Sequence, residues 1–188
     1  APTLCRCQTR PAGDCRSLLH VQNPEPTTMF TASTLTGGKP EQYAQLLEQA
    51  RGLMYGEHDR TANAANLSAL LFNSLPDLNW AGFYFFDGTE LVVGPFQGKP
   101  ACVRIPVGKG VCGAAASSRQ TQRVDDVHAF PGHIACDAAS RSEIVVPLVH
   151  NGQLVGVLDI DSPLPARFDA DDQAGIEAIA AAWVATLG

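Results

Sequence analysis

The chain has 188 residues, 45% of them hydrophobic, and a formal net charge of −6. That length allows one domain with a buried core, and the acidic balance argues against nucleic acid or an anionic membrane as the main partner. No apolar run approaches the roughly 20 residues of a membrane span. The first residues lack the apolar stretch of a secretory signal, so we expect a cytoplasmic protein.

Residues 1–38 differ in character from the rest of the chain. They contain Cys5, Cys7 and Cys15, several Pro and Arg residues, and no helical or strand periodicity. We therefore expect a disordered or loosely attached extension, followed by a single domain over 39–188. The three cysteines with His20 match no standard zinc pattern.

Periodicity and turn signals predict the elements of the domain in order. The helices expected are 40–54, 60–75, 110–118 and 169–187, and the strands are 79–87, 90–96, 103–106, 121–124 and a hairpin over 143–160. A long connection over 125–141 precedes the hairpin. This pattern predicts an α+β fold in which a central antiparallel sheet of about six strands carries the first and last helices on one face. Loops that cover a ligand lie on the other face.

The second strand of the hairpin places two acids in an apolar run. Side chains alternate along a strand, so Asp159 and Asp161 share one face with Val157, while Leu158 and Ile160 face the core. Like charges at this spacing cost free energy unless a cation, a metal or a helix N-terminus lies between them, or one acid is protonated. The alternative interpretation is a solvated strand end before the following turn.

Three thiols precede or accompany these acids. Cys102, Cys112 and Cys136 are followed by Glu143 and the hairpin acids. Buried thiols commonly pack as small hydrophobic groups. Their number, close to costly carboxylates, instead favours redox chemistry on a small cationic or zwitterionic ligand.

The segment GKGVCG over 108–113 matches the G-x-G-x-x-G dinucleotide fingerprint, but no βαβ unit surrounds it. We interpret the glycines as a tight turn into a helix whose N-terminus lies near Cys112. The helix dipole would then lower the pKa of that thiol. The alternative is a loop that happens to contain a buried cysteine.

Seven segments in order resemble the free methionine-(R)-sulfoxide reductases, a family built on the GAF fold. The segments are NWAGFY (79–84), GPFQG (94–98), AC (101–102), GKGVCG (108–113), HIACD (133–137), SEIVVP (142–147) and LDIDSP (158–163). The similarity extends loosely from about Met29 to the C-terminus and leaves residues 1–28 without an inherited role. It implies a GAF-like fold and thiol-dependent reduction of free L-methionine-(R)-sulfoxide.

The resemblance also implies roles for the thiols. Cys136 would attack the sulfoxide sulfur and become a sulfenic acid, and Cys102 would resolve it as a disulfide. Cys112 would be an auxiliary or alternative partner. Thioredoxin would reduce the disulfide, no prosthetic group is implied, and a homodimer is expected by analogy.

The substrate-binding residues follow from the same resemblance and from the chemistry of a free amino acid. Glu143 and Asp159 suit its ammonium group, and Asp161 could be protonated and donate to the sulfoxide oxygen. Trp80 and Tyr84 would wall the methyl end, since aromatic rings favour sulfur. Ordinary core packing is the alternative for both rings.

The connection over 125–141 contains candidate contacts for the substrate carboxylate and a group of histidine and cysteine residues. Backbone N–H groups near Ile134 and Ala135 are candidates for the substrate carboxylate. We expect no metal there, because the spacing of His128, His133 and Cys136 matches no standard site. The competing functions are a GAF-type binding module and a thiol redox sensor without turnover. Glu143→Ala or Asp161→Ala should abolish turnover if the protein is an enzyme, and should leave peroxide-driven disulfide formation intact if it is a redox sensor.

Overall fold

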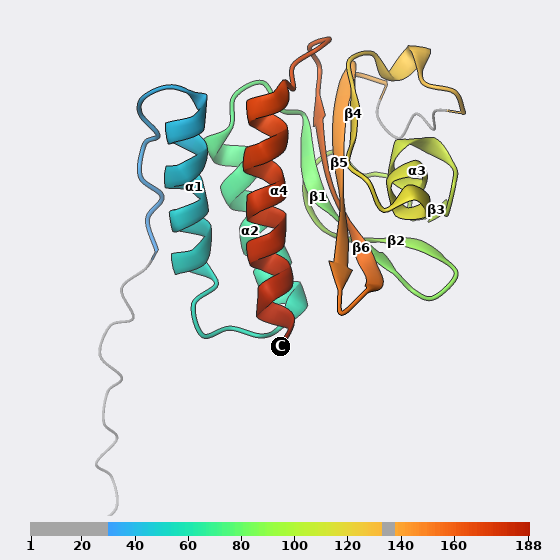
Figure 1. The fold of residues 1–188 in the computed structure, drawn as a ribbon. Helices are drawn as coiled ribbons and strands as arrows, with labels where there is room; N and C mark the ends of the chain where they lie inside the picture. The colour runs from blue at the N-terminus through green and yellow to red at the C-terminus, as the bar shows by residue number, and fades with distance from the viewer. Residues whose placement is uncertain (1–29, 133–137) are drawn as a thin grey trace, which may run out of the picture. The chain divides into compact units, whose positions relative to one another are not determined.

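The computed structural model describes residues 30–132 and 138–188, and residues 31–188 form one unit (Figure 1). Two helices open this unit, α1 (Lys39–Leu53) and α2 (Arg60–Ser74). The Asp59 carboxylate caps α2 by accepting hydrogen bonds from the backbone N–H groups of Thr61 and Ala62, at 2.9 and 2.8 Å. The helix ends before Pro76, which restricts the residue that precedes it.

Among the described residues, six antiparallel strands form a single sheet in the order β3-β2-β1-β6-β5-β4. The strands are β1 (Trp80–Phe86), β2 (Glu90–Gly98), β3 (Arg104–Pro106), β4 (Gln122–Val124), β5 (Ser142–His150) and β6 (Gln153–Ser162). The β5–β6 hairpin turns at Asn151 and Gly152, whose φ angles of 49° and 76° are the positive values that a two-residue hairpin turn requires.

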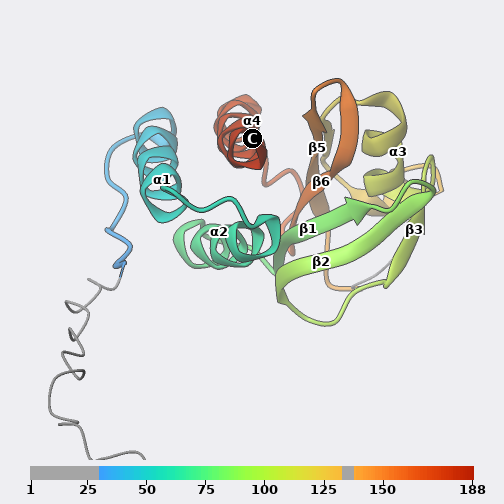
Figure 2. The ribbon, with the colours of Figure 1, turned by 90° about the horizontal axis from the view of Figure 1, so that it is seen from below.

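The two faces of the sheet are covered differently (Figure 2). The helices α1, α2 and α4 (Ala170–Val184) lie on one face and enclose the larger core, which includes Phe83, Leu158 and Trp183. On the other face, α3 (Gly110–Ser118) packs against β5 and β6 over a smaller core. Short 3-10 turns complete the elements, at Val127–Ala129 and Ala185–Leu187.

The predicted fold class is confirmed, and the expected elements occur within one or two residues of their bounds, except that the closing helix gives way to the 3-10 turn Ala185–Leu187. One detail differs, because the ligand-side face carries the helix α3 as well as loops. The division of the chain into an extension and a domain at residue 38 stays a prediction. Residues N-terminal to that boundary contact α1, because the Gln45 and Gln49 side chains exchange hydrogen bonds with the backbone of Thr36 and Ser33. In the described ranges, no helix combines the length and apolar character that crossing a bilayer requires.

Candidate active site

The alternation predicted for β6 places its acids on the face covered by α3. Leu158 and Ile160 enter the helix-side core. Asp159 lies opposite Gly82 of β1 and Val145 of β5. Asp159 is only 6% exposed, so the alternative of a solvated strand end is wrong for this residue. Asp161 is half-buried.

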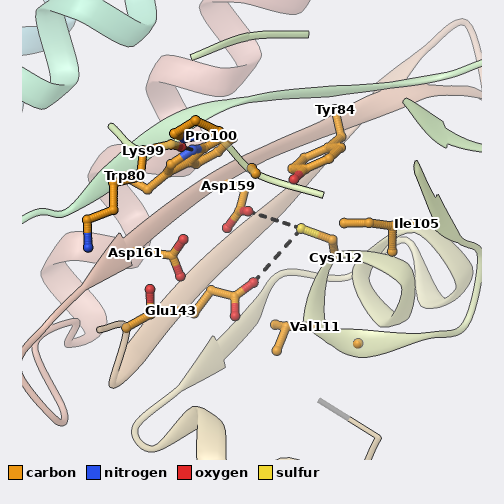
Figure 3. A pocket seen from close by; sticks show the side chains of 13 residues that line it. Trp80, Tyr84, Lys99, Pro100, Ile105, Val111, Cys112, Glu143, Asp159 and Asp161 are labelled. Atoms are coloured by element: carbon orange, nitrogen blue, oxygen red, sulfur yellow. Dashed lines mark hydrogen bonds between the residues drawn. The ribbon is translucent and has the colours of Figure 1, made fainter. Parts of the chain in front are cut away.

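A pocket that opens to solvent lies between this face and α3. Figure 3 shows the side chains that surround it. They come from β1, β3, β5, β6, α3, the β2–β3 connection and the connection that precedes β5: Trp80, Tyr84, Lys99, Pro100, Ala101, Ile105, Gly110, Val111, Cys112, Ser140, Glu143, Asp159 and Asp161.

Aromatic rings form one wall of the pocket. Trp80 stacks on Tyr84 with ring centroids 5.7 Å apart, and on Phe96 at 5.2 Å. The indole N–H donates to the Lys99 carbonyl oxygen at 3.2 Å, which fixes the ring plane. Gly82 permits this packing, because a Cβ there would lie 2.3 Å from the Phe96 Cβ and 2.8 Å from the Trp80 ring.

The Cys112 thiol faces two carboxyl groups across the pocket (Figure 3). Its sulfur lies 3.2 Å from Asp159 Oδ2 and 3.9 Å from Glu143 Oε1. All three side chains are buried, with 4% of Cys112 and 6% of each acid exposed. The second oxygen of Asp159, Oδ1, is buried without a hydrogen-bond partner among the described residues. A buried, unpartnered carboxylate oxygen is costly unless a ligand satisfies it.

The two buried acids hold protons more tightly than acids in water. Burial raises the pKa of Asp159 to about 6, although hydrogen bonds with Cys112 and Glu143 oppose the rise. Burial, with the nearby charges of Asp159 and Asp161, raises the pKa of Glu143 well above its usual value. A positively charged ligand in the pocket would lower both pKa values and favour the ionised forms of the acids, so the site suits a cationic group.

The expectation that Cys112 has a lowered pKa is wrong. The residue does lie in the first turn of α3, but burial and the charges of Asp159 and Glu143 raise its pKa well above the usual value. A helix N-terminus contributes only about half a positive charge, and this is outweighed by desolvation and two carboxylates. Cys112 is thus a neutral thiol that donates its proton to Asp159.

Cys102 is disulfide-bonded. Its partner is not Cys112, which is a free thiol. Cys102 directly follows Ala101, which lines the pocket. The predicted nucleophile Cys136 and the predicted carboxylate contacts Ile134 and Ala135 lie outside the described residues.

The structure brings six of the predicted site residues together in one pocket: Trp80, Tyr84, Cys112, Glu143, Asp159 and Asp161. The sequence reasoning missed several lining residues, notably Lys99, Ile105 and Ser140. Of the described lining residues, Lys99 alone has a cationic side chain. It follows Gly98, the last residue of β2, whose positive φ of 121° favours glycine. The sequence feature that could have indicated Lys99 as a pocket residue is its position directly after a glycine at the end of a strand.

The fold and pocket define a small-molecule-binding α+β domain with a thiol and acids at its centre. Residues 41–186 match the GAF domain family model. A free methionine-R-sulfoxide reductase of Escherichia coli is 57% identical over 143 residues, which are 76% of this chain and 87% of that protein. The chain belongs to the GAF-domain family of free methionine-R-sulfoxide reductases.

Two solved structures illustrate the similarity. A Neisseria meningitidis free methionine-R-sulfoxide reductase, in complex with its substrate, superposes with a TM-score of 0.81 at 42% identity, covering 85% of this chain and 96% of that chain. A Burkholderia vietnamiensis protein described as a candidate GAF sensor is 69% identical, with a TM-score of 0.77 and coverage of 79% and 94%.

Proposed function

We propose that this chain reduces free L-methionine-(R)-sulfoxide to methionine. The observation that carries the proposal is the buried pair Glu143 and Asp159, with an unpartnered Asp159 oxygen, inside a pocket that Trp80 and Tyr84 also line. A free amino acid brings an ammonium group that can donate charge-assisted hydrogen bonds to both acids. A methionine sulfoxide residue within a peptide lacks that charge, so it would leave the acids uncompensated.

The remainder of the substrate fits the other side of the pocket. The methyl and thioether end would contact Trp80 and Tyr84, where sulfur and aromatic rings interact favourably. Asp161, on the same strand face as Asp159, would donate a proton to the sulfoxide oxygen. Backbone N–H groups near Ile134 and Ala135 would bind the substrate carboxylate.

The proposed chemistry transfers oxygen from the substrate to a thiol. The Cys136 sulfur attacks the sulfoxide sulfur and forms a sulfur–sulfur bond. The oxygen then moves to Cys136 as the sulfur–oxygen bond of the substrate and the new sulfur–sulfur bond break. Methionine leaves reduced by two electrons, and Cys136 keeps the oxygen and one proton as a sulfenic acid. A second thiol then displaces that oxygen as water and forms a disulfide.

We assign the second thiol to Cys102. Two observations support this assignment: Cys102 is disulfide-bonded, and Cys112 is excluded as its partner because it is a free, neutral thiol. Cys112 would bind Asp159 rather than resolve the sulfenic acid. A dithiol reductant of the thioredoxin type would restore both thiols by exchange. Use of thioredoxin, a homodimer and a cytoplasmic location are proposals from the family resemblance.

The experiment is consumption of each diastereomer of free methionine sulfoxide by the wild type and by Cys136→Ser, first with dithiothreitol and then with thioredoxin. We expect consumption of the R form alone and its loss in the variant. N-acetylmethionine sulfoxide, whose nitrogen is uncharged, serves as the matched control substrate and should not be consumed. Absence of turnover with either diastereomer would favour a sensor without turnover.

A second measurement separates the resolving thiols. Without reductant, the wild type and Cys112→Ser should each release one methionine per chain and end with a disulfide that contains Cys102. Cys102→Ser should also release one methionine, but it should accumulate the sulfenic acid, which mass spectrometry with a sulfenic-acid trap detects. A disulfide that is lost in Cys112→Ser and retained in Cys102→Ser would reverse the assignment.

A further inference from the structure

The cluster of Cys112, Glu143 and Asp159 has the spacing of a metal site. Each offers one ligand atom, and these atoms lie within 4.8 Å of one another. A tetrahedral zinc ion bound at about 2.3 Å to sulfur and about 2.1 Å to oxygen holds those two atoms about 3.6 Å apart. The distances from Cys112 Sγ, 3.2 Å to Asp159 and 3.9 Å to Glu143, fall on either side of that value.

A second observation points to a ligand at the same place. Asp159 is 94% buried, by its exposed fraction of 6%, and its Oδ1 has no hydrogen-bond partner among the described residues. The side chain lines a pocket that opens to solvent, so an ion has an entry path. Cys112 is a free thiol, and its sulfur is available once the proton leaves.

We propose that Cys112 Sγ, Glu143 and Asp159 together form a zinc-binding site. Three protein ligands leave a fourth tetrahedral position toward the pocket, which a water molecule or a ligand atom can occupy. The thiol proton, and any proton on the two acids, passes to solvent as the ion binds, because zinc ligands are deprotonated. No oxidation or reduction takes place.

The donor set selects among metals. A thiolate favours zinc and other soft or borderline ions over magnesium and calcium, which take oxygen ligands in larger numbers. Zinc would occupy the carboxylate oxygens that the proposed function assigns to the substrate ammonium. Bound zinc therefore excludes an amino acid from the pocket and acts as a competitive inhibitor.

The test measures zinc directly, so its result does not depend on the reductase activity. The full chain is prepared in its disulfide form, with Cys5, Cys7 and Cys15 replaced by serine so that zinc bound to them is not counted. Equilibrium dialysis against ZnCl2 in metal-free buffer then gives the zinc bound per chain. We expect one equivalent, and its loss in Cys112→Ser. Ile105→Val, a pocket residue without a donor atom, is the matched control and should bind as the starting protein does.

Two further measurements keep the test decisive. Glu143→Gln keeps the thiol and the side-chain shape, and should weaken zinc binding at least tenfold even where the cysteine variant fails to fold. CoCl2 in place of ZnCl2 should give a near-ultraviolet thiolate charge-transfer band that Cys112→Ser lacks. Unchanged zinc binding in folded Cys112→Ser, or in Glu143→Gln, would overturn the proposal, as would cobalt binding without that band.

Discussion

Glu143 is held where an ionised carboxylate is costly, because it is buried beside Asp159. Glu143→Gln keeps the shape of the side chain and removes its charge. A hydrogen bond to a charged group contributes about 1.5–3 kcal/mol, so we expect kcat/KM for free methionine-R-sulfoxide to fall about 10- to 150-fold, chiefly through KM. Steady-state kinetics with each enzyme at neutral pH measure this change.

The matched control is Glu90→Gln, which removes a carboxylate of the same sheet outside the pocket, where it pairs with Arg104 at 2.9 Å. That variant should retain wild-type kinetics. Equal losses in both variants would contradict a specific role for Glu143.

Thermal unfolding of Glu143→Gln tests the raised pKa of Glu143 independently of the kinetics. Because the pKa of Glu143 is raised by folding, the folded state binds more protons than the unfolded state, and the ionisable group destabilises the ligand-free protein at neutral pH. The variant should therefore unfold a few degrees higher at pH 7.5, and this advantage should shrink as the pH falls toward about 4.

The pKa of Asp159, about 6, predicts the pH dependence of substrate binding. Above that pH the carboxylate is ionised and attracts the ammonium group. As the pH falls through 6 the carboxylate takes up a proton, and the attraction is lost. We expect kcat/KM to decrease from pH 7 to pH 5 with KM rising. A pH profile at constant ionic strength measures it, and a KM that stays constant over this range would refute the assignment.

At the scale of elements, β1 shapes the aromatic wall through Gly82. A methyl group at this position would meet Phe96 and Trp80 at distances shorter than real contacts allow. Gly82→Ala should therefore separate β1 from β2 locally and displace the indole, at a cost of about 1–3 kcal/mol in the free energy of unfolding. We expect KM to rise as well, because Trp80 lines the pocket.

Denaturant unfolding and kinetics of Gly82→Ala check both effects. The control is Gly52→Ala in α1, where a Cβ meets nothing within 4 Å. It should stabilise the protein by up to about 1 kcal/mol, since alanine is the better helix former. Unchanged stability and KM in Gly82→Ala would show that the strands accommodate the methyl group.

The elements also show which features a sequence can predict. The alternation along residues 157–161 is local, so the inward direction of Leu158 and the pocket direction of Asp159 follow from the strand itself. The pKa of Cys112 is not local. Its direction depends first on burial of the thiol, and then on carboxylates of β5 and β6 that tertiary packing brings against α3. Lys99 reaches the pocket for the same kind of reason, through the path of the β2–β3 connection.

At the scale of the whole domain, the two faces of the sheet differ in whether their buried acids are compensated. The pocket face contains buried acids whose ionised forms a ligand must compensate. The opposite face joins α1 to α4 through a buried acid that is already compensated. Asp172 accepts hydrogen bonds from the Tyr43 hydroxyl at 2.8 Å and from Arg167 at 3.0 Å, and its other oxygen lies 2.6 Å from Lys39 Nζ. Stability and ligand recognition can therefore be changed separately.

Asp172→Asn tests that separation. The Asp172 side chain is 1% exposed and that of Arg167 is 9% exposed, so the substitution leaves a buried guanidinium without its counter-charge. Breaking a buried ion pair costs about 3–5 kcal/mol, and we expect about 3 kcal/mol here because Lys39 is 38% exposed and partly solvated. That loss corresponds to a fall of roughly 6–12 °C in Tm.

The matched control is Asp171→Asn, at an exposed position in the first turn of the same helix, which should cost no more than about 1 kcal/mol. Below the transition, KM for the sulfoxide should match that of the wild type, because the pocket lies across the sheet. A raised KM in folded Asp172→Asn would show instead that the α1–α4 junction and the pocket are coupled through the sheet.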